Sequence, residues 1–274
     1  MVKFFKRNKI SFNLRSSLKI ENLLNYLENN PSITDILYLG GDGSINYLIN
    51  SVDVLKIKQR IYLSKSGSGN DFLRSLKKIG SGNITISDAV TNNKTTKFIN
   101  GCGVGIDASV CYYVNNDSKK NKLSYFKNVF KSVLTYERAS IEVVVDGVTH
   151  NFKNGYLAAI QNGRYFGGGM KVAPEANIED DFYWICIAHN LNKLLIQLLL
   201  LTIYPGFHRY IKKRITMLKG KDIRVKISDK KYFQADGEVM ENVDEITVNK
   251  SVSREFIAFN KRKIKKEWKD KENG

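Results

Sequence analysis

Tyr38-Leu39-Gly40-Gly41-Asp42-Gly43-Ser44-Ile45-Asn46 joins an apolar run to a glycine cluster and then to a second apolar run. We expect a strand that enters a glycine turn and opens a helix. This geometry suits a phosphate, because glycine lets a ligand approach the main chain and the helix start offers free N–H groups. Asp42 could orient a metal, a water or a ribose hydroxyl. An ordinary strand–turn–helix connection explains this short cluster equally well.

A second unit of the same kind follows. Arg60-Ile61-Tyr62-Leu63 is a short apolar run, and Ser66-Gly67-Ser68-Gly69-Asn70-Asp71 leads from it into a predicted helix over 71–78. Crossovers between parallel strands are nearly always right-handed, so two successive units predict parallel strands with both turns at one edge of the sheet. Ligands bind at that edge in open α/β sheets. The pair of turns therefore favours a nucleotide site over a purely structural connection.

From residue 84 onward the pattern changes to short strands and tight turns. Asp146-Gly147 lies between two β-rich runs and predicts a two-residue hairpin turn, since this pair tolerates positive φ. An antiparallel sandwich is the economical arrangement for so many strands. Gly101 to Asp107 is expected to form a glycine-rich bend. Helices are predicted over 18–27, 45–50, 122–134, 191–203 and 207–217, and strands over 33–39, 84–86, 97–100, 141–145, 148–152, 156–160, 182–188, 223–227, 232–235, 245–248 and 255–259.

Composition indicates an anionic partner. Lysine and arginine outnumber acids by 44 to 27, for a net charge of +17. Nucleic acid and an anionic membrane surface both attract such a charge. The chain lacks an arginine-rich arm, zinc-ligand spacing and an aromatic RNA-binding signature, so we expect no nucleic-acid partner. Many of these lysines are expected simply to solvate the surface.

The expected location is the cytoplasm. Three scattered cysteines argue against a disulfide framework, and the basic start at Met1 is followed by no apolar core long enough for a signal peptide. The most apolar run, Leu194 to Ile203, is about half the roughly twenty residues that a membrane crossing needs. We interpret this helix as core or interface first. The alternative is docking on anionic lipid, aided by Lys212, Lys213 and Arg214.

Several motifs, taken in order, resemble the diacylglycerol kinase catalytic-domain family, which includes bacterial soluble lipid kinases and sphingosine kinases. The motifs are Gly-Gly-Asp-Gly-Ser at 40–44, Gly-Ser-Gly-Asn-Asp-Phe at 67–72, Phe-Ile-Asn-Gly-Cys-Gly-Val-Gly-Ile-Asp at 98–107, Asn-Gly-Arg-Tyr-Phe-Gly-Gly-Gly-Met at 162–170 and Asp-Gly-Glu at 236–238. The resemblance covers the chain from about Ile33. It implies an N-terminal doubly wound α/β domain and a C-terminal antiparallel β-sandwich domain with helices. The corresponding boundaries are 1–93 and 94–253, followed over 254–274 by a strand, for which a return to the first domain stays open, and a basic tail.

The resemblance also implies roles for particular residues. Asp236 matches the catalytic base, and Glu238 its acidic partner. Asp88 matches an acid that joins Asp42 and Asp71 in a magnesium–water network. Asp180 matches a structural magnesium ligand, assisted by the main chain near Asn177 and Phe182. The residues that would contact ATP are Gly40, Gly41, Asp42, Gly43, Ser44, Asn46, Ser66, Gly67, Gly69, Asn70 and Asp71.

Structural interpretations remain open for two of these acids. Asp180 is explained about equally well as a turn carboxylate, and Asp181 replaces the glycine that is usual after it. Asp236-Gly237 has the same local sequence as the hairpin pair Asp146-Gly147. Only the flanking Gln234 and Glu238 and the order of the motifs separate the two turns.

The start of the chain departs from the family pattern, which opens with a strand and an Asn-Pro-x-Ser-Gly turn. Asn29-Asn30-Pro31-Ser32 is no substitute, because it follows a predicted helix and stands too close to the glycine turn. We therefore expect a truncated form or a smaller N-terminal sheet.

The main hypothesis is a cytoplasmic, peripherally membrane-associated kinase that uses ATP and Mg²⁺ to phosphorylate diacylglycerol or a related lipid at an anionic membrane surface. The alternative is a weak or inactive homologue that binds lipid or nucleotide. An activity like that of NAD kinases, which share the Gly-Gly-Asp-Gly turn, is disfavoured by the stretch at 67–72. A homodimer stays open.

Overall fold

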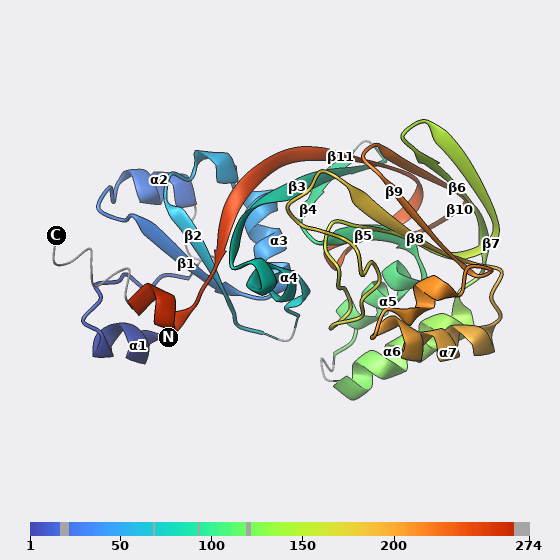
Figure 1. The fold of residues 1–274 in the computed structure, drawn as a ribbon, viewed down its shortest axis with the longest axis horizontal. Coiled ribbons are helices and arrows are strands. Elements are labelled where there is room, and N and C mark those ends of the chain that lie inside the picture. The colour runs from blue at the N-terminus through green and yellow to red at the C-terminus, as the bar shows by residue number, and fades with distance from the viewer. Residues whose placement is uncertain (17–21, 68, 93, 119–121, 266–274) are drawn as a thin grey trace.

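A computed structural model describes residues 1–16, 22–67, 69–92, 94–118 and 122–265 of the chain (Figure 1). The helices in this part are α1 (Val2–Arg7), α2 (Leu23–Glu28), α3 (Asp42–Ser51), α4 (Asp71–Ile79), α5 (Ile106–Asn115), α6 (Lys122–Thr135), α7 (Lys193–Ile203) and the 3₁₀ turns η2 (Val54–Lys56) and η3 (Phe207–Tyr210). The strands are β1 (Asp35–Gly40), β2 (Arg60–Lys65), β3 (Ser81–Thr91), β4 (Lys94–Phe98), β5 (Gly101–Gly105), β6 (Ala139–Val145), β7 (Val148–Gln161), β8 (Tyr183–His189), β9 (Ile215–Gly220), β10 (Ile223–Ala235) and β11 (Glu238–Ala258).

The two predicted strand–turn–helix units form the N-terminal part of the molecule. β1 and β2 pair in parallel from Asp35 opposite Arg60 to Gly40 opposite Lys65, as predicted. α3 and α4 follow these strands and bury apolar side chains against them and against the end of β11. The helix expected from Ile45 begins three residues earlier, at Asp42. A carboxylate in the first turn is favoured there by the helix dipole.

The long strand β11 connects the two parts of the molecule. It runs antiparallel to β3 from Thr247 opposite Val90 to Ile257 opposite Ser81. Its last residues then pair in parallel with Tyr62 and Leu63 of β2. Figure 1 shows it as the long arching ribbon that spans the molecule. The end of β11 thus lies beside β2, while the exact domain boundaries remain a prediction.

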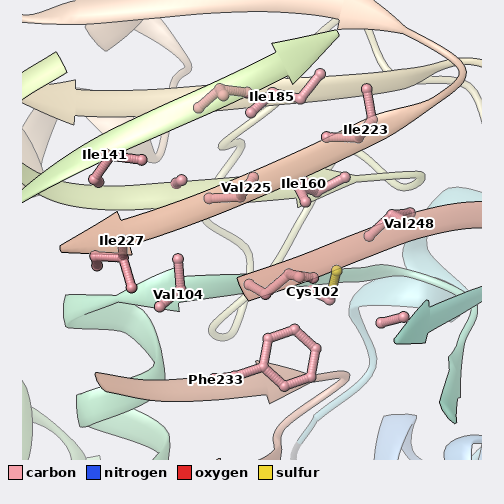
Figure 2. Close-up of a cluster of buried hydrophobic side chains, with 14 of the residues drawn as sticks. Cys102, Val104, Ile141, Ile160, Ile185, Ile223, Val225, Ile227, Phe233 and Val248 are labelled. Carbon is pink, nitrogen blue, oxygen red and sulfur yellow. The ribbon is translucent and has the colours of Figure 1, made fainter. Parts of the chain in front are cut away.

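The C-terminal part is a β-rich layer structure. β6 pairs with β7 and β10, and β5 pairs with the same two strands. The long strands β7 and β10 therefore pass from one layer to the other. β8 and β9 extend the layer that contains β5. Apolar side chains fill the space between the layers; Figure 2 shows Ile141, Ile160, Ile185, Val225 and Phe233 among them. The predicted combination of an α/β part and an antiparallel sandwich is confirmed.

Three helices cover the outer face of the layer that contains β5, β7 and β8. α5, α6 and α7 lie together on this side in Figure 1. Val133 of α6 and Ile196 of α7 join Leu157, Cys186 and other strand residues in a separate apolar cluster. This cluster fixes one face of α7 and leaves its opposite face outside the core. Within the described residues, no helix is long and apolar enough to cross a membrane.

Some sequence expectations are wrong. The helix predicted over 207–217 is only the turn η3, because Ile215 to Gly220 pair with β8 as strand β9. The glycine-rich bend from Gly101 is strand β5 followed by the unpredicted helix α5. At Gly103 a side chain would meet the Ala158 carbonyl at 2.8 Å, so glycine lets β5 approach β7 closely. The runs 223–227 and 232–235 are one strand, as are 245–248 and 255–259.

Two predicted segments fall partly outside the described residues. The helix expected over 18–27 includes residues 18–21, which are not described, and the structure has α2 at Leu23–Glu28. The basic tail from residue 266 onward is not described either.

Candidate functional site

The two glycine turns are hydrogen-bonded to each other. The Ser66 amide donates to the Gly40 carbonyl over 2.9 Å, and the Asp42 amide donates to the Gly69 carbonyl over 3.1 Å. Gly41 lies so close to the second turn that a β-carbon on it would approach the Gly69 carbonyl to 2.4 Å. Glycine at this position therefore allows the close approach. The turns form one unit at the carboxyl ends of β1 and β2.

Asp42 joins the first turn to the second helix. Its two carboxylate oxygens accept hydrogen bonds from the amides of Asp71 at 2.8 Å and Phe72 at 3.1 Å. These amides are free at the start of α4, so the side chain caps that helix from a distance in sequence. Burial raises the pKa of Asp42, and the two amide hydrogen bonds oppose that rise. The starts of α3 and α4 thus share one acidic side chain.

Asp71 connects α4 to the glycine-rich loop at 162–170 of the β-rich part. Its Oδ2 accepts a hydrogen bond from the Gly168 amide over 2.7 Å. Burial, and secondarily the charge of Asp42, raises the pKa of Asp71 to about 6, against the opposing Gly168 hydrogen bond. Arg74, one turn further along α4, lies with its guanidinium 5.1 Å from the Tyr165 ring and leaves no room for a side chain at Gly169. The loop at 162–170 therefore packs against α4, beside the sheet edge where the first glycine turn predicts a nucleotide.

Asp236 lies in the turn between β10 and β11, and main-chain amides surround its carboxylate. Its oxygens accept hydrogen bonds from the amides of Ile99 at 2.8 Å, Asn100 at 3.1 Å and Gly101 at 3.0 Å. Burial raises the pKa of Asp236 to about 6, the amide hydrogen bonds oppose the rise, and the charge of Asp42 adds to it. The catalytic candidate of the β-rich part therefore lies within electrostatic reach of the acid in the first glycine turn.

A polar network supports Asp236 from within the sandwich. Gln234 accepts a hydrogen bond from the Gly237 amide over 3.0 Å and donates to Asp107 over 3.1 Å. Burial raises the pKa of Asp107 to about 6, and the Gln234 hydrogen bond opposes that rise. Asn100 donates to the Tyr165 carbonyl over 2.6 Å and so connects this network with the glycine-rich loop. Roles for Asn100, Asp107 and Arg74 were missed, because each depends on a partner far away in the sequence.

The other residues predicted to contact nucleotide occupy different environments. Gly43, Ser44, Ser66, Gly67 and Gly69 are exposed, as an open ligand edge requires.

Two of the predicted nucleotide contacts have less exposed side chains. Asn70 is half-buried and donates to the Gly67 carbonyl over 2.9 Å, which shapes the second turn. Asn46 is buried and donates to the Lys97 carbonyl over 3.2 Å, so its amide is engaged with β4. Glu238 is exposed at the start of β11. The contacts of all these residues with nucleotide and substrate remain predictions.

The candidate magnesium residues fall into two groups. Asp88 lies on β3, opposite Lys97 of β4, and its Oδ1 is buried without a hydrogen-bond donor among the described residues. A buried carboxylate oxygen of this kind fits a water or a hard cation. Asp180 accepts a hydrogen bond from the Phe182 amide over 3.1 Å, and its own amide donates to the Asn177 carbonyl over 3.3 Å.

This second group has the form of a turn, with Asp181 paired to Lys250 beside it. In the described part of the chain, no three His, Cys, Asp or Glu side chains gather as a metal cluster. Both magnesium assignments remain predictions.

Residues 101–252 match the family described as the YegS C-terminal NAD kinase beta sandwich-like domain. This range is more than half of the chain, and the chain belongs to that family. The resemblance to bacterial diacylglycerol kinases predicted from the motifs is confirmed by the relatives and solved structures that follow.

Among curated relatives, YtlR of Bacillus subtilis (strain 168), named as a candidate lipid kinase, is 29% identical over 244 residues, which cover 75% of this chain and 74% of that protein. The diacylglycerol kinase of the same organism is 24% identical over 216 residues, covering 74% and 70%. A candidate lipid kinase of Staphylococcus epidermidis (strain ATCC 12228) is 29% identical over 165 residues, and the match spans 53% of that protein.

Among solved structures, a candidate diacylglycerol kinase from Bacillus anthracis str. Sterne shares the fold with a TM-score of 0.64. It is 20% identical, and the match covers 86% of this chain and 82% of that one. A second solved diacylglycerol kinase structure from the same organism gives a TM-score of 0.57.

Proposed function

We propose that this chain is a lipid kinase that transfers the γ-phosphoryl group of ATP to the hydroxyl of diacylglycerol or a related lipid. The observation that carries the proposal is a chain of hydrogen bonds from Asp236 to the glycine turns. Asn100 joins the Asp236 carboxylate to the loop at 162–170, and that loop is bonded to Asp71, whose amide donates to Asp42. The names of the relatives YtlR and diacylglycerol kinase support a lipid acceptor.

The glycine turns would hold the phosphates of ATP. The start of α3 would offer main-chain N–H groups, and α3 and α4 both direct the positive ends of their dipoles toward the exposed glycines. The first two amides of α4 are already bonded to Asp42. Mg²⁺, when bound, would neutralise phosphate charge, and Asp42, Asp71 and Asp88 would hold it through water molecules. Asp71 would also keep the loop at 162–170 over this edge through its bond to Gly168.

Asp236 would act as the general base. Its carboxylate would take the proton of the lipid hydroxyl while the hydroxyl oxygen bonds to the γ-phosphorus and the bond to the β–γ bridging oxygen breaks, so that ADP leaves with the electron pair. A pKa of about 6 keeps this carboxylate unprotonated at neutral pH and more basic than an exposed aspartate. The amides of Ile99, Asn100 and Gly101 would fix its orientation.

A catalytically weak homologue is the second candidate, because the oxygens of Asp42 and Asp236 already accept main-chain hydrogen bonds. Under this hypothesis the site binds nucleotide or lipid without turnover.

Transfer of radiolabel from γ-labelled ATP tests the proposal. The acceptors would be diacylglycerol and a long-chain amino alcohol in detergent micelles, and NAD in solution, each with Mg²⁺ and with excess chelator. We expect labelled lipid that depends on Mg²⁺ and falls by about 10²- to 10⁴-fold in Asp236→Asn. Label on NAD alone would contradict a lipid acceptor. If the unaltered protein and Asp236→Asn transferred equal amounts of label to lipid while both still bound ATP in calorimetry, the weak homologue would be favoured.

A further inference from the structure

The helix α7 carries an apolar face that the protein core does not cover. Leu194, Leu198 and Leu201 are 66%, 53% and 74% exposed, and their spacing of four and three residues places them on one side of the helix. The other side holds Ile196, which is buried with strand residues of the sandwich. Core packing therefore accounts for one side of the helix, and the expected alternatives of an interface and of lipid docking concern its exposed side.

The apolar surface continues beyond α7. Gly206, at φ of +87°, turns the chain into η3, where Phe207 and Tyr210 are exposed. A side chain at Gly206 would meet Pro174 at 2.7 Å, so the turn is packed against the loop that follows the sandwich strand β7. We call the exposed side chains of α7 and η3 together the α7–η3 surface: Leu194, Leu198, Leu201, Tyr204, Phe207, Tyr210 and Ile211.

The sequence around the α7–η3 surface is basic, and one acid outside it, Glu175, pairs with Arg209 of η3. Residues 190–214 contain five lysines and arginines and no acid. Lys212 and Lys213 are exposed at the end of the surface. Lys193, at its other end, contacts the Leu134 carbonyl of α6. Apolar side chains bordered by basic ones are the composition of surfaces that lie in the interface of an anionic membrane.

The α7–η3 surface is attached to the candidate site through the loop at 162–174. The Lys171 amide donates to the Ile203 carbonyl over 3.0 Å, and His208 Nε2 lies 3.0 Å from the Val172 carbonyl. A few residues earlier, the same loop reaches Asp71 through Gly168. One short loop therefore contacts both this surface and the nucleotide edge.

We infer that the α7–η3 surface docks the protein on an anionic lipid bilayer, with its leucine and aromatic side chains in the headgroup region and its lysines on acidic headgroups. The inference rests on the proposed lipid kinase function and names the surface through which that function reaches its substrate. A second copy of the chain fits less well, because a two-fold contact would place the basic residues of 190–214 against each other.

Vesicle sedimentation tests the inference with the full chain. The vesicles would be phosphatidylcholine alone, or phosphatidylcholine with about a third phosphatidylglycerol. We expect binding to the anionic vesicles that weakens with salt. Leu198→Gln with Leu201→Gln should lower the partition coefficient at least about ten-fold, because two side chains lose their transfer to the interface. Lys212→Gln with Lys213→Gln should lower it about ten-fold on anionic vesicles only.

Matched controls lie on the N-terminal part of the molecule. Leu55 is 52% exposed on η2, and Lys56 and Lys58 are exposed beside it. Leu55→Gln and the double change Lys56→Gln with Lys58→Gln should leave vesicle binding within about two-fold of the unaltered protein. Unaltered thermal unfolding of the α7 variants, expected because these positions are exposed, assigns the loss to the surface.

Equal binding of the α7 variants and their controls would overturn the inference, as would binding unaffected by phosphatidylglycerol. A dimer that the leucine changes dissociate, with vesicle binding unchanged, would assign the surface to a second copy and overturn it as well. Transfer of phosphate to micellar diacylglycerol without vesicle binding removes the inference and keeps the proposed function. Vesicle binding that the leucine and lysine changes weaken, without any phosphoryl transfer, keeps the docking surface and removes the proposed kinase function.

Discussion

Two Asp-Gly turns in this chain have almost the same backbone and very different surroundings. Asp146 and Asp236 have φ of 49° and 48°, and the glycines that follow have φ of 82° and 93°. The amide of each aspartate donates to a carbonyl on another segment, that of Asp222 in one case and that of Gly101 in the other. Each carboxylate also accepts main-chain amides from that same segment. By local geometry the turns are interchangeable.

Their electrostatic settings are opposite. Asp146 is exposed, and the amide hydrogen bonds of Asp222 and Lys221 lower its pKa. Burial and the nearby Asp42 raise the pKa of Asp236 to about 6 in spite of its three amide donors. The difference shows that the elements packed around a hairpin aspartate, rather than the sequence of the turn itself, set the proton affinity of its carboxylate.

The largest expected effect is on catalysis. Asp236→Asn should lower the rate of phosphoryl transfer by about 10²- to 10⁴-fold, because an amide cannot accept the hydroxyl proton. Asp146→Asn should leave the rate unchanged, since that carboxylate is exposed and its amide partners belong to Lys221 and Asp222 rather than to the segments that contact the glycine turns. Initial rates with micellar diacylglycerol, together with ATP binding by calorimetry, measure both. Equal rates for the two variants would show that the Asp146 and Asp236 turns do not differ in their effect on phosphoryl transfer.

The second prediction concerns pH and has opposite signs at the two turns. The folded-state pKa of Asp236 lies above the ordinary 3.8, so the folded protein binds this proton more tightly than the unfolded chain does. The stability that this proton contributes is therefore present below pH about 4 and is lost as pH rises to about 6. Relative to Asp236→Asn, the free energy of unfolding of the unaltered protein should fall by up to about 3 kcal/mol across that range. The folded-state pKa of Asp146 is lowered, so its contribution is present above pH about 4 and is lost as pH falls further.

Urea unfolding of the unaltered protein and the two Asn variants between pH 3 and pH 7 provides the test. Subtraction of the data for each variant separates one turn from Asp71 and Asp107, because burial raises the pKa of these two carboxyls to about 6 as well. Slopes of the same sign at both turns would show that the burial of Asp236 does not control its proton affinity. The transfer rate should rise with pH through about 6 if the unprotonated carboxylate is the base.

Sequence patterns were sufficient to predict the parts of the fold that depend on neighbouring residues. The parallel pair β1 and β2, helix α4 and the hairpin at Asp146-Gly147 all follow from local apolar patterns and turn chemistry. Residues 207–217 were assigned wrongly, because the spacing of the apolar residues in this mixed segment is compatible with a helix, whereas residues from Ile215 onward pair with β8 as a strand.

The candidate site was predictable as a set of residues but not as an arrangement. Asp42, Asp71 and Asp236 were found by their motifs. Their hydrogen bonds to Phe72, Gly168 and the amides at 99–101 join segments up to 137 residues apart, and no local pattern encodes such partners. Likewise, hydropathy detected the apolar run at Leu194 but could not tell which of its side chains the sandwich would cover.

A smaller difference between the two turns, in unfolding free energy, is expected from substitutions two residues before each aspartate. Gln234 donates to buried Asp107 and accepts from Gly237, so Gln234→Ala removes partners from buried polar groups and should cost about 1 to 3 kcal/mol of unfolding free energy. Val144 is the equivalent position before Asp146 and is half-buried, so Val144→Ala should cost less than about 1.5 kcal/mol. Chemical denaturation at pH 7 compares them. A smaller cost at Gln234 would mean that the polar network does not support the Asp236 turn.

The smallest difference in unfolding free energy between the two turns is expected from alanine substitutions at the glycines that follow the aspartates. Both have φ between 82° and 93°, and a side chain at Gly147 or Gly237 would meet no atom within 4 Å. The cost of alanine is therefore conformational at both positions and should be about 1 to 2 kcal/mol for each. Phosphoryl transfer by Gly237→Ala should stay within a few-fold, because the carboxylate of Asp236 keeps its three amide donors. A cost at Gly237 that clearly exceeds the cost at Gly147 in denaturant unfolding would reveal strain in the Asp236 turn, and the two turns would then differ in backbone energy as well as in burial.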